Sequence, residues 1–381
     1  MSQAKNVLFL ALGHLANDSL YSSLPPLLPI LIATYGLSTA LVGVLPALYM
    51  VVASFLQPIF GQVYDRRNLT WLMSLGLVMG GAAVASIGYV GSYTSILMAA
   101  VVGGLGSALF HPVATSLSSR QLSHGRASSV SLFMLGGNLG LSLGPLIIVS
   151  TIASINIRGT FIALILPLIA ATILFRFRGD IGSTRRDTRS GGRVDRRALS
   201  LVLLASVLRG TATITLITYL PLYLTWQGLP LGMGGLMLST MLLAGGAGMV
   251  VAGLVADRFD RIHVASAILL ISAPVLLAFT MAPIQAMWVL AALMGFTLMA
   301  AHPILVVIAQ ELLPGRTGLA SALIYGVAFG VSNLTTPFIG LAIDAIGFQR
   351  TFETLTILPI IGGILTILTA RAKKHIHETA G

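Results

Sequence analysis

The feature that most constrains this chain is the recurrence of long apolar runs from one end to the other. An α-helix rises about 1.5 Å per residue, so a run of about 20 residues crosses the hydrocarbon core of a bilayer. With 56% hydrophobic and only 9% charged residues, the chain also lacks the polar residues that a soluble surface needs. The sequence therefore predicts an all-α integral membrane protein.

Glycines, prolines and charge clusters separate the apolar runs and give twelve expected transmembrane helices. The first run carries polar residues and is followed by no small-residue cleavage site, so it is interpreted as a span and not as a signal peptide. The expected spans are residues 6–33, 38–63, 69–90, 94–119, 127–152, 157–176, 198–225, 231–256, 262–281, 284–312, 318–343 and 348–370.

Positive charge is distributed unevenly between the two sides of these spans. Nineteen of the 22 Lys and Arg residues fall on the side of the N-terminus, while Arg158 and Arg350 fall on the other and Arg209 lies inside a span. Positively charged loops face the cytoplasm, which predicts a cell (plasma or inner) membrane protein with both termini cytoplasmic. The same asymmetry accounts for the net charge of +11, so no nucleic-acid partner is expected.

An Arg-rich interval, 177–197, divides the chain into halves 1–176 and 198–370, and a basic tail, 371–381, follows. The halves repeat at offsets of 190 to 192 residues. The matching stretches are "GQVYDR" (61–66) with "GLVADR" (253–258), "HP" at 111–112 with 302–303, residues 125–140 with 315–330, and Pro145 with Pro337. Matches in one order at one offset indicate an internal repeat, here two parallel six-helix halves.

The first span carries a polar stripe. His14, Asp18 and Tyr21 share one helix face at i, i+4 and i+7, and Asn17 lies at its edge. Asp18 falls near the membrane midplane, where a charge is costly unless it faces a cavity or a partner. The three prolines of segment 25–29 predict a bend further along the helix.

The repeat places Arg209 at the position equivalent to Asp18, and His302 at the position equivalent to His111. An acid and a base at one depth suggest a pair across the central axis, and the arginine fork also suits carboxylate, phosphate or phosphonate. Both histidines precede proline and are candidates for proton relay or anion binding. No third ligand accompanies either histidine at metal-site spacing, so no metal site is predicted.

Small residues recur at four-residue spacing in 136–145 and 326–337, which favours close packing between the halves. Asn138 is a candidate for the substrate path or for an interhelical hydrogen bond. Charged pairs at the cytoplasmic helix ends are interpreted as gating and packing elements. Those elements comprise Gly61, Asp65, Arg66, Gly253, Asp257 and Arg258.

Two parallel six-helix halves with a G-x-x-x-D-R element after the second and eighth helices resemble the major facilitator superfamily. Within it, the chain is similar to the fosmidomycin-resistance-type exporters. The motifs that carry this similarity are "HLAND" (14–18), "FLQPIFGQVYD" (55–65), "FHP" (110–112), "GGNLGLSLGP" (136–145) and "AQELLPGR" (309–316). One departure is Val113, where the resemblance implies an acidic residue after the His-Pro pair.

These features predict a proton-coupled secondary antiporter that exports small drug-like or toxic compounds by alternating access. Asp18 is the candidate proton carrier, and Arg209 the candidate anion ligand or counter-ion. The expected partners are a small-molecule substrate, protons and membrane lipid, with a monomer and no cofactor. The alternatives are an uptake carrier or exchanger for an organic anion and a non-transporting receptor or channel. Phosphate-loop, H-E-x-x-H and G-x-S-x-G motifs are absent, so no enzyme is expected.

Overall fold

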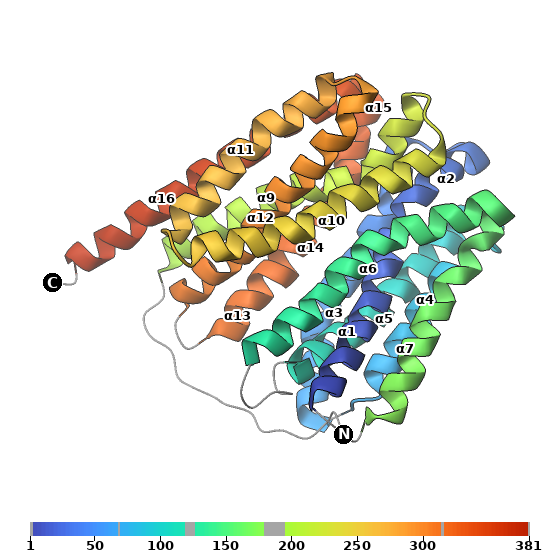
Figure 1. The fold of residues 1–381 in the computed structure, drawn as a ribbon, viewed down its shortest axis with the longest axis horizontal. Helices are drawn as coiled ribbons and strands as arrows, with labels where there is room; N and C mark the ends of the chain where they lie inside the picture. The colour runs from blue at the N-terminus through green and yellow to red at the C-terminus, as the bar shows by residue number, and fades with distance from the viewer. Residues whose placement is uncertain (1–2, 68, 119–125, 179–194, 314–315, 380–381) are drawn as a thin grey trace. The chain divides into compact units, whose positions relative to one another are not determined.

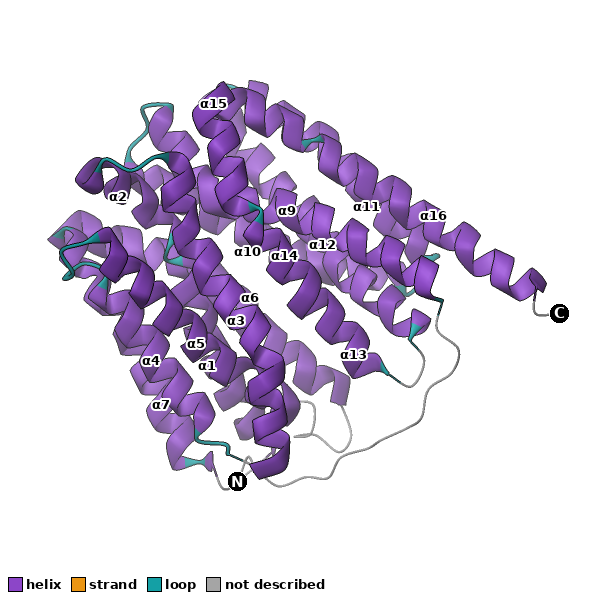
Figure 2. Cartoon of the chain, turned by 180° about the vertical axis from the view of Figure 1, so that it is seen from behind, coloured by secondary structure: helices purple, strands orange, loops and turns teal. Residues whose placement is uncertain are grey.

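Helices dominate the computed structural model, which describes residues 3–67, 69–118, 126–178, 195–313 and 316–379. Figure 2 shows helices joined by short loops, with no strand in the described part of the chain. A helix satisfies its backbone hydrogen bonds within the segment, which is what a bilayer requires of a chain that crosses it. The predicted all-α membrane fold is confirmed.

Nine helical stretches among the described residues are long and apolar enough to cross a membrane. Two expected spans are missing from these nine, because the polar residues of 6–33 lower its hydropathy and the helix within 69–90 is short. Two further expected spans, 318–343 and 348–370, fall within a single apolar stretch, Leu319–Ala370, whose helical geometry is interrupted at Gly347. Twelve spans therefore stay a prediction.

The first expected span bends at its prolines, as predicted. Helix α1 (Gln3–Ser22) ends before a 3-10 turn, η1 (Pro25–Leu27), and helix α2 (Leu28–Tyr35) follows. Proline lacks the backbone N–H that would continue the helical ladder, so the chain turns within this segment. Gly36 then ends α2 in the left-handed conformation, with φ of 63°.

The chain forms two compact units. Unit 1 comprises residues 1–186 and 218–239, and unit 2 comprises 187–217 and 240–381. In unit 1 (Figure 1), α1 and α2 precede α3 (Thr39–Arg67), α4 (Leu72–Ser86), α5 (Tyr93–Ser118), α6 (Arg126–Ile155), η2 (Ile157–Leu164) and α7 (Ile165–Arg176). Helices α9 (Arg196–Trp226) and α10 (Leu231–Ala256) each contribute to both units.

Small residues let α6 lie directly against α1 within unit 1. A Cβ at Gly136 would clash with the backbone of Ala11, and a Cβ at Gly140 with that of Leu15. Because the glycines recur every four residues, they form one continuous bare face along α6. The predicted close packing therefore exists, but this glycine face serves a contact inside one unit.

Unit 2 continues with α11 (Arg261–Met281), α12 (Ile284–Leu312), α13 (Thr317–Ala322), η3 (Leu323–Ala328), α14 (Phe329–Leu334), α15 (Thr336–Leu355) and α16 (Ile357–Thr379). The segment η3 is a π-helix, a wider turn that is often found at functional sites. Gly347 breaks the helical geometry of α15 with φ of 81°, between the expected spans 318–343 and 348–370. Apolar side chains such as Val202, Leu305 and Ile308 fill the core of this unit.

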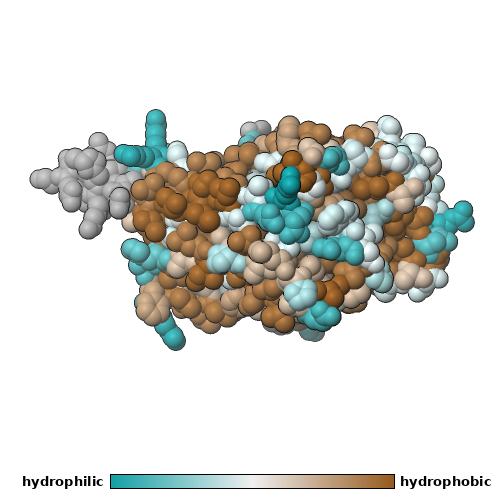
Figure 3. Space-filling model, turned by 90° about the horizontal axis from the view of Figure 1, so that it is seen from above, coloured by the Kyte–Doolittle hydropathy of each residue, from teal (hydrophilic) through white to brown (hydrophobic). Residues whose placement is uncertain are grey.

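Large hydrophobic side chains also lie at the surface. The face shown in Figure 3 is covered largely by hydrophobic residues, with polar residues scattered between them. Exposed examples from both units are Met98, Leu168, Val250, Leu254, Val289 and Phe338. A soluble monomer rarely exposes apolar surface on this scale, whereas the lipid-facing side of a membrane helix requires it.

Candidate functional site

An acid and two histidines meet inside unit 1. Asp18 of α1 lies between His14, one helical turn earlier, and His111 of α5. The Nε2 atom of His14 is 3.2 Å from Oδ2 of Asp18, and the Nε2 atom of His111 is 3.2 Å from Oδ1. The exposed fractions of the side chains are 6% for His14, 16% for Asp18 and 24% for His111. The polar stripe predicted on the first span thus faces a partner on another helix.

Helix α6 fixes the orientation of His14. The Nδ1 atom of His14 is 2.8 Å from the carbonyl oxygen of Phe133, and the His14 and Phe133 rings stack with centroids 4.1 Å apart. Gly137, one turn along α6, leaves room for the cluster, because a Cβ there would lie 2.6 Å from Nε2 of His14. The ring is therefore held by a hydrogen bond at one nitrogen and aimed at Asp18 with the other.

These contacts require a proton between His14 and Asp18. A carbonyl oxygen only accepts hydrogen bonds, so Nδ1 of His14 carries a hydrogen. In a neutral ring Nε2 would then be a bare acceptor facing a carboxylate oxygen, which is repulsive. The pair is either an imidazolium beside a carboxylate or a neutral imidazole beside a carboxylic acid. Both arrangements hold one exchangeable proton.

Two further polar groups complete the cluster. The amide nitrogen of Asn17 donates to Oδ1 of Asp18 at 3.0 Å and to the hydroxyl of Ser107 at 3.2 Å. The hydroxyl of Ser107 is in turn 3.1 Å from Nδ1 of His111. Nδ1 of His111 therefore faces a hydroxyl that can donate or accept, while its Nε2 faces the carboxyl group of Asp18.

Unit 2 carries a buried arginine at the position that the repeat relates to Asp18. Arg209 of α9 is 4% exposed, and its Nη2 atom is 3.1 Å from Nδ1 of His302 on α12. Its Nη1 atom donates to the carbonyl oxygen of Leu298 at 3.3 Å and to the hydroxyl of Thr213 at 3.4 Å. His302 also meets the edge of Tyr325, from the π-helix, with ring centroids 4.8 Å apart.

The charge of Arg209 has no acidic partner in the described part of unit 2. Among the described residues of that unit, no carboxylate oxygen lies within 4.0 Å of its guanidinium. Its Nε atom is buried and without a hydrogen-bond partner. An uncompensated buried charge is costly, which makes this group a natural receptor for an anion.

Two other residues predicted to line the path, Tyr21 and Asn138, have different surroundings. Tyr21 is 4% exposed, and its ring lies 5.9 Å from that of Tyr49. Asn138 is half-buried on α6, where its carbonyl oxygen accepts a hydrogen bond from Ser142. Among the described residues, no hydrogen bond joins the side chain of Asn138 to His14, Asp18 or His111.

The predicted gating elements are described only in part. The side chains of Asp65 and Arg66 lie outside the described residues. Gly61 packs near Pro112: a Cβ added at Gly61 would lie 3.4 Å from the Cβ of Pro112. At Gly253, the repeat-related position, an added Cβ would have no neighbour within 4 Å. The side chain of Arg258 is exposed.

Asp257 belongs to a charged network between α10, α11 and α12. It lies 3.9 Å from Arg261, which pairs with Glu311 at 2.5 Å. Asp260 caps α11 by accepting the backbone N–H of His263 at 3.0 Å, and this hydrogen bond holds the pKa of the carboxyl below its usual value. Glu311 stands inside the motif "AQELLPGR", so the network connects two sequence signatures.

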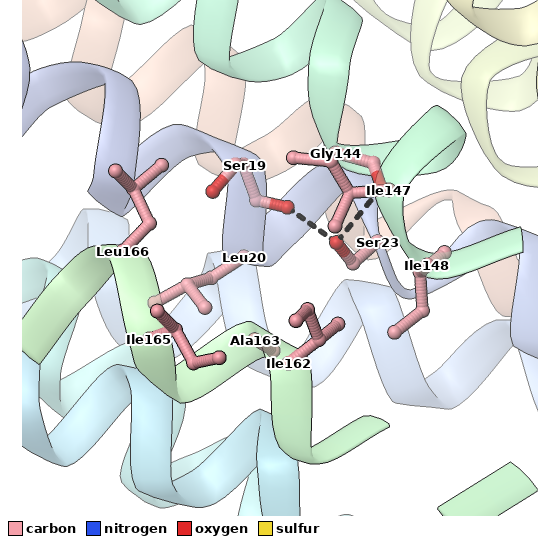
Figure 4. Close-up of a pocket in the computed structure, with 10 residues that line it drawn as sticks. All are labelled: Ser19, Leu20, Ser23, Gly144, Ile147, Ile148, Ile162, Ala163, Ile165 and Leu166. Atoms are coloured by element: carbon pink, nitrogen blue, oxygen red, sulfur yellow. Dashed lines mark hydrogen bonds between the residues drawn. The ribbon is translucent and has the colours of Figure 1, made fainter. Parts of the chain in front are cut away.

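A separate cavity of about 130 Å³ lies in unit 1 between α1, α6 and the η2–α7 segment (Figure 4). Its lining is mainly apolar, with isoleucines such as Ile147 and Ile162. The hydroxyl of Ser23 is already bonded to the carbonyl oxygens of Ser19 and Gly144. The cavity contains none of the predicted site residues and no ionisable group.

Several contributors to the two clusters were not predicted. Ser107 and Thr213 lie one helical turn from His111 and Arg209, so i, i+4 spacing was the available signal. Phe133 contributes its backbone carbonyl oxygen, and Gly137 contributes only the absence of a side chain. Neither contribution leaves a polar pattern in the sequence. The metal prediction considered each histidine on its own helix and did not bring His14, Asp18 and His111 together.

Ionisable groups buried inside membrane helices are typical of transport proteins. The chain belongs to the Major Facilitator Superfamily, whose model matches residues 10–237 and 202–380. It is 29% identical to the fosmidomycin resistance protein of Escherichia coli over 94% of this chain and 91% of that protein. It is also 29% identical to the multidrug efflux protein YfmO of Bacillus subtilis, over 46% of this chain and 44% of that protein.

A solved structure confirms the fold. The bacterial homolog of the human lysosomal transporter Spinster aligns over 97% of both chains, with a TM-score of 0.80 and 16% sequence identity. The chain is accordingly a multi-pass membrane transporter of small molecules, and the predicted resemblance to the fosmidomycin-resistance type is confirmed.

Proposed function

We propose that the chain is a proton-coupled exporter of small anionic drug-like compounds that works by alternating access. The observation that carries the proposal is the position of the His14 ring, with Nδ1 bonded to the carbonyl oxygen of Phe133 and Nε2 facing Asp18. We infer from it that the pair holds an exchangeable proton. A transporter needs such a group to exchange a proton for substrate, because a proton must be bound on one side and released on the other. The names of two relatives, a fosmidomycin resistance protein and a multidrug efflux protein, support the direction of export.

The two units divide the work in this proposal. Asp18, with His14 and His111, carries the proton in unit 1. Arg209, supported by His302, binds the negative charge of the substrate in unit 2. A phosphonate such as fosmidomycin fits a guanidinium whose Nε is unbonded, because the arginine fork donates two parallel hydrogen bonds. The proposal includes a cell membrane location, cytoplasmic termini, a monomeric state and the halves 1–176 and 198–370.

Proton-driven transport in proteoliposomes tests the proposal. Vesicles containing the purified chain and a pH-sensitive dye are given an inside-acidic gradient, and fosmidomycin uptake and dye response are followed together. Substrate entry with simultaneous proton exit supports antiport. The exposed variant Asp260→Asn serves as a matched acidic control and is expected to behave as the unsubstituted chain.

Arg209 also supports a second candidate, an uptake carrier or exchanger for an organic anion. In that case substrate and protons move in the same direction, or substrate exchanges for a second anion with no dye response. A channel or receptor would show no saturable counterflow of labelled substrate. The same vesicles thus separate all the alternatives.

A further inference from the structure

The cluster of His14, Asp18 and His111 has the donor set of a transition-metal site. Its two imidazole nitrogens and its carboxylate oxygen lie within 4.8 Å of one another. Each Nε2 is 3.2 Å from an oxygen of Asp18. Donors around a tetrahedral Zn²⁺ are about 3.3 Å apart, given metal–donor bonds of about 2.0–2.1 Å. Each histidine is thus already at the donor–donor spacing of a coordination sphere from one carboxylate oxygen, His14 from Oδ2 and His111 from Oδ1.

The second nitrogen of each ring, Nδ1, lies within hydrogen-bond distance of a carbonyl oxygen, as is usual for metal-binding histidines. Nδ1 of His14 donates to the carbonyl oxygen of Phe133, and Nδ1 of His111 lies 3.2 Å from that of Ser107. Such a bond fixes the tautomer that directs the Nε2 lone pair toward a metal. Asn17 holds the carboxylate in the same way, by donating to Oδ1 of Asp18 at 3.0 Å.

We propose that this cluster binds a divalent late first-row transition metal, such as Zn²⁺, through His14, Asp18 and His111. Water completes the tetrahedron, since three protein ligands leave one position open. Two imidazoles and one carboxylate favour Zn²⁺, Co²⁺ or Ni²⁺ over Mg²⁺ and Ca²⁺, which prefer oxygen alone. The partial exposure of Asp18 and His111 leaves a route to the ligands.

A bound metal and the shared proton exclude each other. Nε2 of His14 and the carboxylate of Asp18 are the atoms that hold the proton, and both are needed as bare donors for the metal. The inference goes beyond the proposed transport, because it is measured as metal binding to the resting protein and does not depend on substrate or direction.

Co²⁺ binding to the purified full chain tests the inference, because tetrahedral Co²⁺ absorbs visible light far more strongly than the octahedral aqueous ion. The protein carries a tag without histidine, and His124, His263, His375 and His377 are replaced by Gln to remove other ligands. We expect saturation at one equivalent, an intense tetrahedral band, and its loss when Zn²⁺ is added.

Variants assign the site. His111→Gln and Asp18→Asn are expected to abolish the band and to lower Co²⁺ affinity at least about tenfold. His302→Gln removes the buried histidine of unit 2 and is expected to leave both unchanged. Because His111 is partly exposed, His111→Gln decides the question if Asp18→Asn does not fold. Non-saturable binding, an octahedral spectrum, or a band that survives His111→Gln would overturn the assignment.

Discussion

Arg209 donates from Nη2 to Nδ1 of His302 across 3.1 Å, and this bond determines the state of the histidine. A guanidinium has no acceptor, so Nδ1 of His302 must be the bare nitrogen and Nε2 must carry the hydrogen. A protonated His302 would also place two positive charges in contact. The pair therefore presents one cation with a neutral neighbour, whereas the repeat-related pair of Asp18 and His111 places a carboxyl group beside a histidine.

Arg209→Gln is expected to weaken binding of an anionic substrate. A hydrogen bond to a charged group contributes about 1.5–3 kcal/mol, so the dissociation constant for fosmidomycin should rise by roughly 10-fold to 100-fold. Ligand-dependent thermal stabilisation of the purified protein measures the change. Because the substitution also removes an uncompensated buried charge, the unliganded protein should not lose stability.

Arg209→Lys is the matched control for that prediction. Lysine keeps the positive charge but lacks the planar fork, so an intermediate affinity is expected. Equal affinity in the Gln variant and the unsubstituted chain would show that the anion binds elsewhere.

Gly137→Ala is expected to disrupt the cluster of His14 and Asp18. The added Cβ would lie 2.6 Å from Nε2 of His14 and 2.8 Å from Oδ2 of Asp18, closer than van der Waals contact allows. Overpacking of this kind costs about 1–3 kcal/mol, so we expect the melting temperature to fall by a few degrees. We also expect proton-driven transport to be lost. Differential scanning fluorimetry measures the first effect and proteoliposome uptake the second.

Gly253→Ala tests the same substitution where space is open. Apart from the backbone of its own helix, no atom lies within 4 Å of a Cβ added at Gly253. Alanine also favours the helix over glycine by about 1 kcal/mol. The melting temperature should therefore stay or rise. A fall equal to that of Gly137→Ala would mean that crowding at the cluster is not the cause.

Much of the fold was predictable because a bilayer imposes simple rules on sequence. Apolar length indicated the helices, and the prolines of segment 25–29 indicated the break between α1 and α2. The break at Gly347 falls in the interval left between the expected spans 318–343 and 348–370. The π-helix around Tyr325 was not predictable, because local apolar sequence does not distinguish it from regular helix.

The sequence singled out the ionisable residues of the two clusters but not the contacts that they make with other helices. Helical periodicity placed His14 and Asp18 on one face, and the repeat matched Asp18 to Arg209. Periodicity within one helix says nothing about which neighbouring helix it meets. The contact of Asp18 with His111, the carbonyl of Phe133 and the bare surface at Gly137 depend on how α1, α5 and α6 pack.

Asp260 gives the network at α11 a pH dependence. The backbone N–H of His263 lowers the pKa of this carboxyl, so ionised Asp260 stabilises the folded state. That stabilisation is complete above the unfolded pKa of 3.8 and is lost as pH falls through the lower folded pKa. Asp260→Ala, which also removes the cap, should cost about 1 kcal/mol near pH 7.

Thermal melting of Asp260→Ala and of the unsubstituted chain, from pH 7 to below pH 3.8, tests the direction of this pH dependence. Their difference should shrink as the medium becomes more acidic than pH 3.8. His263 faces the same carboxylate at 2.6 Å, so His263→Gln is measured in parallel to separate its contribution. A difference that grows on acidification would contradict the assignment.

The distribution of Lys and Arg predicts topology. The chain has no cysteine, so single cysteines can be placed and labelled without background. Cysteines at Ser183 and Ser190 should react only from the cytoplasm, and those at Ser92 and Gln227 only from outside. Impermeant maleimide on intact cells and on inverted vesicles measures both. Labelling at Ser183 from outside would overturn the twelve-span arrangement.

Asp18→Asn separates proton coupling from substrate binding. The amide keeps the size of the carboxylate but cannot share a proton with His14, so the cluster loses its exchangeable proton. We expect the variant to fold and to exchange substrate for substrate. Accumulation driven by a pH gradient should fall to the level of empty vesicles, measured in the same preparation as the exchange.

The double variant Asp18→Asn with Arg209→Gln decides whether these residues serve transport or structure. If they form a structural pair, Asp18→Asn leaves Arg209 buried and unpaired at a cost of about 3–5 kcal/mol, and the second substitution should restore stability and transport together. If Asp18 couples protons, the double variant melts no lower than the single one, yet gradient-driven accumulation stays absent. Full recovery of that accumulation would refute the coupling role and return the polar stripe of α1 to a packing function.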